Sequence, residues 1–485
     1  MTTNTIRQRK LPALASLLLV ICCGMVQAAP ASTLTSKIDE YLQASVKHDQ
    51  FSGSVLVAKE GKPIFSDAYG MANYELGVAN TSQTVYAIAS LTKQFTAMAI
   101  LQLQERKQLM ISDPICRYLD DCPEAWQPIT IHHLLTHTSG IKNYSSLPEW
   151  DDQISRLPYE RKAFVKVFRD LPLQFTPGEK HGYSNSGYYL LGLIIERVSG
   201  VSYADFLREN IFAPLAMNSS GYYDPPALVA NRANGYYWAN GGFVNAPILN
   251  QSLTFSGGGI HSTTQDLLRW DQALYSEKLV SQQSLKEMFT PFLSGYAYGW
   301  KIASMHGKKM AGHSGSYNGF SSFIARYADD GVVIIVLSNS DRTSAAKVAI
   351  DVSAMVFDAP YTIPKPQIAD VLTQALAEKG VDAAIKEVRT LIHSRSEQYN
   401  FERQEKAIND LGYALLEQRK AADAIKVFAL NVELAPDSGN AYDSLAEAYM
   451  INGDKQQAIS FYQKSLQLDP DNQNAVKMLQ VLQSK

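Results

Sequence analysis

The feature that most constrains the fold of this chain is a repeat of 34 residues near its C-terminal end. A shift by this period brings small, apolar and turn-forming residues of one segment onto the same types in the next. The aligned pairs are Ala407 with Ala441, Leu411 with Leu445, Ala414 with Ala448, Ala424 with Ala458, Leu434 with Leu468, and Pro436 with Pro470. Paired alanines let two helices approach closely, and a proline ends each unit. The pattern predicts stacked helix pairs with a capping helix over residues 473–483, and it disfavours an unrelated helical bundle.

The period and the alternation of small and large residues resemble tetratricopeptide repeats. This resemblance implies an all-α repeat domain over residues 403–485, with a concave face suited to a peptide or protein partner. Residues 367–398 have a helical pattern without the register of the repeat, so they form either a degenerate repeat or a connector. Three prolines between residues 359 and 366 indicate a linker. We therefore predict a linker and degenerate helical segment over residues 359–402.

Two hairpin patterns flank a mostly helical stretch in the chain before this linker. The first spans residues 52–69 and turns at Glu60-Gly61, and the second spans residues 320–337 and turns at residues 329–331. Helical patterns cover residues 33–49, 94–107, 183–198, 266–274 and 342–357. Hairpins at both ends favour one antiparallel sheet built from the N- and C-terminal segments of a domain, flanked by helices and accompanied by a helical lobe. We predict this α+β domain over residues 33–358.

The first 28 residues have the pattern of a secretory signal peptide. Three basic residues precede an apolar stretch from Leu11 to Val26, which ends in the small-residue pattern Val26-Gln27-Ala28. The alternative is an uncleaved membrane anchor, but the stretch is short for a span and Pro12 interrupts its start. We expect cleavage after Ala28 and a periplasmic or secreted protein without a stable membrane span.

Charge and cysteine usage narrow the classes of partner and site. The whole chain has a net charge of −3, and loss of the signal peptide makes the mature chain more acidic. No basic stripe is visible, which argues against nucleic acid and anionic lipid as partners. Cys116 and Cys122 remain after signal cleavage, and an even pair in an exported protein predicts a disulfide. A zinc site would need two further ligands nearby, and the sequence offers none at the usual spacing.

Ser90-x-x-Lys93 is the motif that carries the chemistry. A serine and a lysine three residues apart share one face of the first turn of a helix. The backbone N–H groups there favour negative charge at the serine, and the lysine can take the hydroxyl proton if burial lowers its pKa. The same spacing occurs at Ser344 and Lys347, but no further motif follows it. We therefore predict a covalent acyl-enzyme on Ser90.

Tyr183-Ser184-Asn185 is the only Tyr-x-Asn in the chain, and it lies downstream of Ser90. A tyrosine at a helix start beside a lysine can act as a general base, because the cation stabilises the phenolate. Asn185 is expected to orient Lys93 and to bind a substrate amide. The alternative for Tyr183 is an interface tyrosine with a satisfied hydroxyl.

His313-Ser314-Gly315 is the third motif and precedes a strand-like run. Gly315 would let the edge of a strand approach a ligand closely. The backbone N–H groups of Ser316 and Ser90 are then candidates for an oxyanion hole. The run from Ser256 to Gly259 is interpreted as a structural turn. His132, His133 and His137 are interpreted as a packed, hydrogen-bonded turn and not as a metal cluster, because no carboxylate or cysteine completes a usual ligand spacing.

These three motifs resemble those of the penicillin-recognising serine hydrolases, as do residues 133–140 (HLLTHTSG) and 175–179 (FTPGE). The group includes class C β-lactamases, D-alanyl-D-alanine carboxypeptidases, D-aminopeptidases and related esterases. The resemblance covers residues 33–357 and implies a β-lactamase/transpeptidase-like fold. It also implies an acyl-enzyme on Ser90, with Lys93 and Tyr183 as the base pair and with neither metal nor cofactor.

The third motif departs from the pattern of the class C β-lactamases, which have Lys-Thr-Gly where this chain has His-Ser-Gly. In that family the lysine helps to bind the substrate carboxylate, and a histidine supplies less charge at neutral pH. We expect His313 to contact a substrate carboxylate in its protonated form, and the alternative is that it only hydrogen-bonds the serine, a tyrosine or the backbone. The motif is similar to the His-x-Gly variants among D-amino-acid peptidases and mitochondrial lactamase-like proteins.

The predicted function is an exported serine hydrolase that acts on D-amino-acid-containing peptides or amides, or on β-lactam-like substrates. The alternatives are a carboxylesterase with the same residues, and a slow-turnover penicillin-binding or scaffold protein that recruits partners through its repeats.

Overall fold

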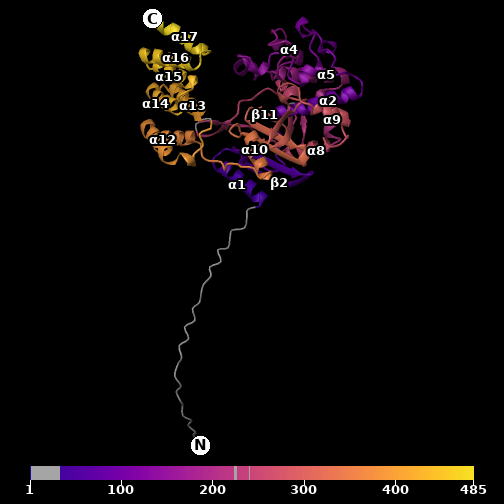
Figure 1. Cartoon of the computed structure of the whole chain (residues 1–485), viewed down its shortest axis with the longest axis horizontal. Coiled ribbons are helices and arrows are strands. Elements are labelled where there is room, and N and C mark those ends of the chain that lie inside the picture. Colours follow the sequence, from indigo (N-terminus) through magenta and orange to yellow (C-terminus); the bar gives the residue numbers. More distant parts are fainter. Residues whose placement is uncertain (2–32, 223–226, 240, 403, 485) are drawn as a thin grey trace. The chain divides into compact units, whose positions relative to one another are not determined.

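The computed structural model describes residues 33–222, 227–239, 241–402 and 404–484, together with Met1 (Figure 1). The predicted signal peptide, from residue 2 onward, and its cleavage site lie outside the described residues. Within the described ranges, no helix has both the length and the apolar character needed to cross a bilayer.

A six-stranded antiparallel sheet joins the two ends of the first domain. Its strand order is β10-β11-β12-β13-β1-β2. The strands are β1 (Gly53–Lys59), β2 (Lys62–Tyr69), β10 (Lys301–Met305), β11 (Lys308–Tyr317), β12 (Phe320–Tyr327) and β13 (Val332–Ser338). β1 pairs with β13, so that Gly53 lies opposite Ser338 and Lys59 opposite Val332. Both predicted hairpins and the closure of the sheet by the N- and C-terminal segments are therefore confirmed, and Figure 1 shows these indigo and orange segments side by side.

Alternation along the strands gives the sheet two buried faces. Val55 and Val57 point to a core shared with α1 (Leu34–Lys47) and α10 (Ala345–Val356). Leu56 and Ala58 point to the larger core on the opposite face, where α8 (Thr264–Ala273) covers β1 and β13. Each aliphatic side chain that is fully buried in this way contributes about 1.5–3 kcal/mol. The sheet is thus a packed layer, and β11 can carry a site where its residues 313–317 extend past the pairing with β10.

The helical lobe is built around α2 (Thr92–Glu105), in which every residue from Thr92 to Leu103 is buried. A helix with apolar contacts all around is a central helix. The helices α5 (Asn185–Ser199), α6 (Tyr203–Leu207), α7 (Phe255–Gly258) and α9 (Gln282–Met288) pack on it, and α3 (Ile131–Leu135) packs on α5. The lobe also includes α4 (Arg161–Arg169). Beyond α2, Cys116 and Cys122 are joined by a disulfide that closes a short loop.

Short strand pairs border the lobe. They are β3 (Met71–Asn73) with β4 (Val78–Ala79) and β7 (Tyr236–Ala239) with β8 (Gly242–Asn245). A three-stranded sheet joins them, in which β9 (Ile260–Ser262) lies between β5 (Tyr86–Ala87) and β6 (Gly221–Tyr222). β5 leads directly into the turn before α2. These pairs therefore fix the entry of the chain into the central helix.

The C-terminal region is all-α, as its repeat predicted. Its helices are α11 (Ile368–Lys379), α12 (Val381–Arg395), α13 (Gln404–Glu417), α14 (Ala421–Leu434), α15 (Gly439–Ile451), α16 (Lys455–Leu468) and α17 (Gln473–Gln483). First helices stack on first helices, α11 on α13 and α13 on α15, while α12 stacks on α14. The segment without repeat register therefore still forms a helix pair that continues the stack. Ala424 and Ala458, one period apart, are both fully buried, as close helix packing requires.

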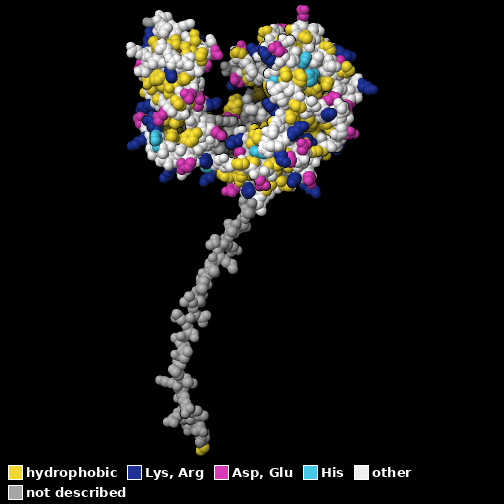
Figure 2. Space-filling view, in the orientation of Figure 1, with side chains coloured by type: hydrophobic (Ala, Val, Ile, Leu, Met, Phe, Trp, Pro, Cys, Tyr) yellow, Lys and Arg dark blue, Asp and Glu magenta, His cyan; other side chains and the backbone are white. Residues whose placement is uncertain are grey.

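On the face seen in Figure 2, acidic and basic side chains are interspersed over the sheet domain and the helical region. Mixed charge of this kind lacks the single-sign field that attracts a polyanion.

Candidate active site

Ser90 lies in the single turn η1 (Ala89–Leu91), immediately before the central helix α2. The residue before it, Ala89, has φ of +47°, in the left-handed region that non-glycine residues rarely adopt. Ser90 is partly exposed, whereas Leu91 and Lys93 are fully buried. The strained turn thus exposes the Ser90 hydroxyl at the surface, next to residues that are buried in the core.

Lys93 is completely buried and its ammonium nitrogen has three close partners. Nζ lies 3.0 Å from Ser90 Oγ, 2.8 Å from Asn185 Oδ1 and 2.7 Å from the carbonyl oxygen of Gly257. Burial lowers the pKa of Lys93 well below its usual range. A neutral amine has two N–H groups and one lone pair. The two carbonyl oxygens can accept the N–H groups, so the lone pair remains for the Ser90 hydroxyl.

Tyr183 contacts Ser90 from the other side. Its hydroxyl donates to Ser90 Oγ at 2.8 Å, and Lys93 Nζ lies 4.9 Å from its ring centroid. Although 38% of the residue is exposed, burial of the phenol raises the pKa of Tyr183 above its usual range, and the bond to Ser90 offsets this only in part. In the resting site Tyr183 is therefore a protonated donor, and Lys93 is the group able to accept the serine proton.

Asn185 is the first residue of α5, and it connects Lys93 to a loop that the sequence did not single out. Its backbone N–H donates to Asn143 Oδ1 at 3.1 Å, and its Nδ2 donates to Ser145 Oγ at 3.0 Å. These bonds aim the side-chain oxygen at Lys93. Ser145 is thus a supporting residue for which the sequence carried no signal.

Gly315 brings β11 against the turn that carries Ser90. A Cβ atom at this position would lie 2.4 Å from the carbonyl oxygen of Ile88 and 3.1 Å from Ala89 Cβ. No side chain fits there, so glycine is required for the approach. Ser316 follows Gly315 on the same strand. The oxyanion-hole role of the Ser316 and Ser90 backbone N–H groups stays a prediction.

His313 lies inside β11, the predicted strand after the motif is β12, and only 6% of His313 is exposed. Its Nδ1 lies 2.6 Å from the carbonyl oxygen of Ser314, which can only accept, so Nδ1 carries the proton. Its Nε2 then accepts from the Tyr296 hydroxyl at 2.8 Å. Burial lowers the pKa of His313 to about 3.

The expectation of a protonated His313 that binds a carboxylate is therefore corrected. Both ring nitrogens already have protein partners, and a cation at this buried position would lose its hydration. The imidazole is neutral and belongs to the wall beside Tyr183, with their ring centroids 6.4 Å apart. The sequence motif did not show that His313 is neutral, because the burial of its side chain depends on the packing of Tyr296.

Gly257 is a further residue of the site for which the sequence carried no signal. The glycine run from Ser256 to Gly259 was expected to be only a structural turn, but residues 255–258 form the short helix α7. The carbonyl oxygen of Gly257 accepts a bond from Lys93. Ser344, by contrast, caps α10 by accepting from the backbone N–H of Lys347. In the part of the chain that the structure describes, no three His, Cys, Asp or Glu side chains gather as a metal site would require.

Comparison with known proteins agrees with this geometry. The Beta-lactamase family model matches residues 35–354, and the Tetratricopeptide repeat model matches residues 439–472. Penicillin-binding protein 4* of Bacillus subtilis (strain 168) is 32% identical over 373 residues, which cover 72% of this chain and 79% of that protein. Teichoic acid D-alanine hydrolase of Staphylococcus aureus (strain MRSA252) is 29% identical over 311 residues, covering 62% of this chain and 73% of that protein.

A solved structure shares the fold. The octameric penicillin-binding protein homologue from Pyrococcus abyssi superposes with a TM-score of 0.60 at 27% identity, over 70% of this chain and 81% of that one. The resemblance drawn from the motifs is confirmed by the family match over 35–354. The chain belongs to the β-lactamase family of serine hydrolases, and its C-terminal region contains a tetratricopeptide repeat.

Proposed function

We propose that this protein hydrolyses esters or amides of D-aminoacyl groups through an acyl-enzyme on Ser90. The observation that carries the proposal is the pair of contacts on Ser90 Oγ, from Lys93 Nζ at 3.0 Å and from the Tyr183 hydroxyl at 2.8 Å. Lys93 can accept a proton, and Tyr183 can donate one. An acyl transfer needs both of these acts within one site.

In the first step, Ser90 Oγ attacks the carbonyl carbon of the substrate while Lys93 accepts the hydroxyl proton. The charge that develops on the substrate oxygen would face the backbone N–H groups of Ser90 and Ser316. Tyr183 then donates its phenolic proton to the departing alcohol or amine, and the proton held by Lys93 restores the tyrosine. Water attacks the acyl-enzyme in the second step with the same groups in reversed roles, which releases the acid and regenerates Ser90.

The third motif favours substrates without a free carboxylate near the leaving group. A neutral His313 supplies no positive charge there, so efficient hydrolysis of β-lactams, which bear that carboxylate, is disfavoured. The relative named as a teichoic acid D-alanine hydrolase supports a D-alanyl acyl group. A carboxylesterase activity and a slow penicillin-binding activity are the alternative outcomes of the test below.

The test compares D-alanine methyl ester, its L-enantiomer, an acetate ester and a fluorescent penicillin, with wild-type protein and Ser90→Ala. We expect Ser90-dependent turnover that prefers the D-ester. Equal turnover of all three esters would instead identify a carboxylesterase. Stable labelling by the penicillin without turnover of any ester would identify a slow penicillin-binding protein.

We also propose the division of the chain that the sequence predicted: hydrolase domain 33–358, linker and degenerate helices 359–402, and repeats with a capping helix 403–485. The family matches, which end at 354 and begin again at 439, support it. Export, with loss of residues 1–28, belongs to the same proposal. Sequencing of the mature N-terminus from a fractionated cell tests it, and an intact Met1 in the cytoplasmic fraction would contradict it.

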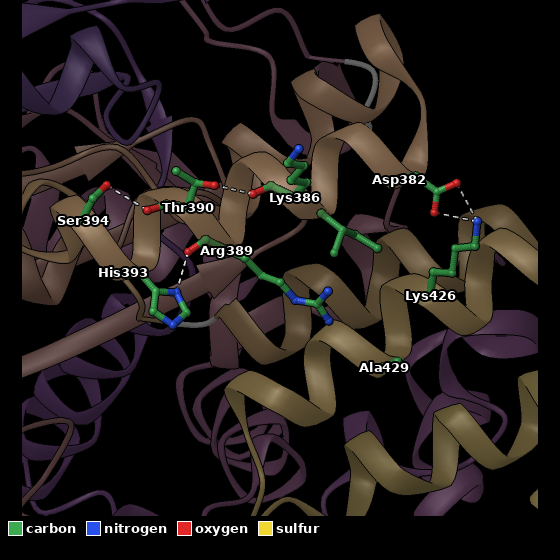
Figure 3. A pocket seen from close by; sticks show the side chains of 9 residues that line it. Asp382, Lys386, Arg389, Thr390, His393, Ser394, Lys426 and Ala429 are labelled. Carbon is green, nitrogen blue, oxygen red and sulfur yellow. Dashed lines mark hydrogen bonds and ion pairs between the residues drawn. The ribbon is translucent and has the colours of Figure 1, made fainter.

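We propose in addition that the helical region binds an acidic peptide segment of a partner. A groove of about 700 Å³ lies between α12 and α14 (Figure 3). Three basic side chains, Lys386, Arg389 and Lys426, line it with a single acid, Asp382. Lys426 pairs with Asp382 and Arg389 with Glu433 beyond the groove, so among the described residues Lys386 is the basic side chain of the groove without an ion pair, and it is the one that would bind the acidic segment. The groove involves the second helices of neighbouring units, whereas the sequence favoured the concave face.

Fluorescence anisotropy of the full chain with oligoglutamate and with oligolysine of equal length tests this proposal. We expect the acidic peptide to bind and Lys386→Glu to weaken it. Lys477→Glu on α17, outside the groove, is the matched control and should bind as wild type does. Equal binding of both peptides, or equal effects of both substitutions, would refute the acidic partner.

A further inference from the structure

His137 contacts Tyr183 and both of its neighbours in the chain. The backbone N–H of Gly182, the residue before the tyrosine, donates to the carbonyl oxygen of His137 at 2.8 Å. The backbone N–H of Ser184, the residue after it, donates to His137 Nδ1 at 3.1 Å. The imidazole and phenol rings lie with centroids 4.2 Å apart. A single residue therefore holds Tyr183 from both sides along the chain and from one face of its ring.

The hydrogen bonds fix the tautomer of His137. Because Nδ1 accepts from Ser184, the ring proton resides on Nε2. The residue is 1% exposed, and among the described residues Nε2 has no hydrogen-bond partner. Burial lowers the pKa of His137 well below its usual range. A second proton on Nδ1 would also face the Ser184 N–H, so the imidazole stays neutral.

The backbone at His137 indicates that this side chain is needed where it is. Its φ is +57°, in the left-handed region, which few residues other than glycine adopt, although asparagine, aspartate and histidine are enriched there. The turn is held by its own bonds, from Thr138 N–H to the His133 carbonyl and from Gly178 N–H to the Thr138 carbonyl. Strain at a buried histidine beside a catalytic group is typical of a functional constraint.

The surroundings of the ring are aromatic. The rings of Tyr188 and Tyr296 lie with centroids 5.0 Å and 4.6 Å from that of His137, and that of His181 lies at 5.9 Å. Tyr296 is the residue that donates to His313. His137 is therefore the centre of the wall against which Tyr183 is placed.

We propose that His137 is a positioning residue for Tyr183, which holds the phenol at hydrogen-bond distance from Ser90 Oγ. The inference rests on the proposed function, because it concerns the geometry of the same acyl-enzyme step. It assigns a role to His137, which the sequence pattern indicated only as part of a packed, hydrogen-bonded turn. A displacement of about 1 Å at a catalytic group is enough to slow a reaction by about a hundredfold.

Two substitutions separate the contacts of the side chain. His137→Phe keeps a ring against Tyr183 but removes the acceptor for Ser184. His137→Asn keeps an acceptor near the place of Nδ1, and asparagine tolerates the left-handed backbone. We expect the phenylalanine variant to lose about tenfold to a hundredfold in acylation rate with little change in KM. We expect the asparagine variant to stay within about fivefold of wild type.

The measurement is the rate constant for labelling of Ser90 by a fluorophosphonate, in wild type, in each His137 variant, in Tyr183→Phe and in the double variants. If His137 acts through Tyr183, His137→Phe causes no further loss when Tyr183→Phe is already present. His132→Phe is the control, since His132 lies on α3, just before the motif, and contacts Tyr298 rather than Tyr183, and it should label at the wild-type rate.

Multiplying effects in the double variant, or equal losses for His137→Phe and His137→Asn, would overturn the positioning role while leaving the acyl-enzyme intact. Wild-type protein that is not labelled at Ser90 would overturn the proposed function and this inference together. If His137→Phe does not fold, His137→Gln, whose oxygen lies near the place of Nε2, takes its place with the same expected loss.

Discussion

The carbonyl oxygen of Gly257 lies 2.7 Å from Lys93 Nζ, although the two residues are 164 positions apart in the chain. Together with Asn185 Oδ1 it takes up the N–H groups of the amine and leaves the third position to Ser90. A backbone carbonyl cannot be protonated or rotated away as a side chain can. The bond therefore sets the direction of the lysine lone pair, which is the property that a general base needs.

The first prediction concerns pH. Because burial lowers the pKa of Lys93, kcat/KM should rise as pH increases through that lowered pKa and then level off, since only the neutral amine accepts the serine proton. His313 stays neutral well above its pKa of about 3, so it adds no falling limb near neutrality. Esters with and without a free carboxylate should then share one profile. A bell-shaped curve for the carboxylate ester alone would restore the cationic role of His313.

Lys93→Arg, which cannot lose its proton, should lower the rate by about 10²–10⁴-fold.

The second prediction separates the two Ser-x-x-Lys sites. Ser90→Ala should abolish labelling by a covalent inhibitor, as measured by intact mass, and leave the melting temperature nearly unchanged. Ser344→Ala should label normally but lose about 0.5–2 kcal/mol of stability, because Ser344 caps α10. Label on the Ser90→Ala protein would refute the assignment of the nucleophile.

The third prediction uses the contact of Gly315 with the Ser90 turn. A Cβ atom there would lie 2.3 Å from Ser322 Oγ and 2.4 Å from the Ile88 carbonyl, so Gly315→Ala must move β11 away. We expect an acylation rate about a hundredfold lower, from loss of alignment. Gly242→Ala is the matched control, because its Cβ would meet nothing within 4 Å. Equal rates for the two variants would show that β11 does not shape the site.

The fourth prediction concerns the buried ion pair between Asp271 on α8 and Arg326 on β12, whose side chains are 1% and 5% exposed. Burial raises the pKa of Asp271 to about 6 although Arg326 lies beside it. A raised carboxyl pKa means that the native state binds the proton more tightly than the unfolded state. The corresponding stability is present below the unfolded pKa of 3.8 and is lost as pH rises through about 6.

The free energy of unfolding in urea, measured from pH 4 to pH 8, should therefore decline by about 2 kcal/mol from this group. Asp271→Asn should remove most of that decline, whereas Asp437→Asn, on the surface of the helical region, should not. Asp271→Ala should cost about 3–5 kcal/mol at pH 7, since it leaves Arg326 buried without a partner. A wild-type stability that increases over this pH range would contradict the raised pKa.

The fifth prediction is that removal of residues 367–485 leaves ester hydrolysis within about twofold of the full chain, because the helical region has its own buried core. Tyr361 and Ile363 of the linker pack against the core of the sheet domain and should be retained. Loss of activity in a truncated protein that melts as the full chain does would show that the helices contribute to the site.

The sequence by itself determined the elements whose signals are local. The period of 34 residues predicted the helices α13–α17, and the alternation in residues 52–69 and 320–337 predicted four strands of the sheet. These patterns are visible because helices and strands bury every third or fourth, or every second, residue. β10 and β11 were not predicted. Residues 311–316 are small and polar, and their strand conformation follows from pairing with β12 rather than from their own pattern.

The candidate site divides in the same way. Ser90, Lys93, Tyr183 and Asn185 were named from motif spacing, since the chemistry requires particular side chains at particular intervals. Only the tertiary structure decided that the carbonyl of Gly257 completes the environment of Lys93, that His313 is neutral, and that His137 lies against Tyr183. Each of these depends on burial and on contacts between distant segments. Every residue has a backbone carbonyl, so the sequence does not show which carbonyl will bind the lysine. The charge of a histidine, likewise, is set by the groups that surround it.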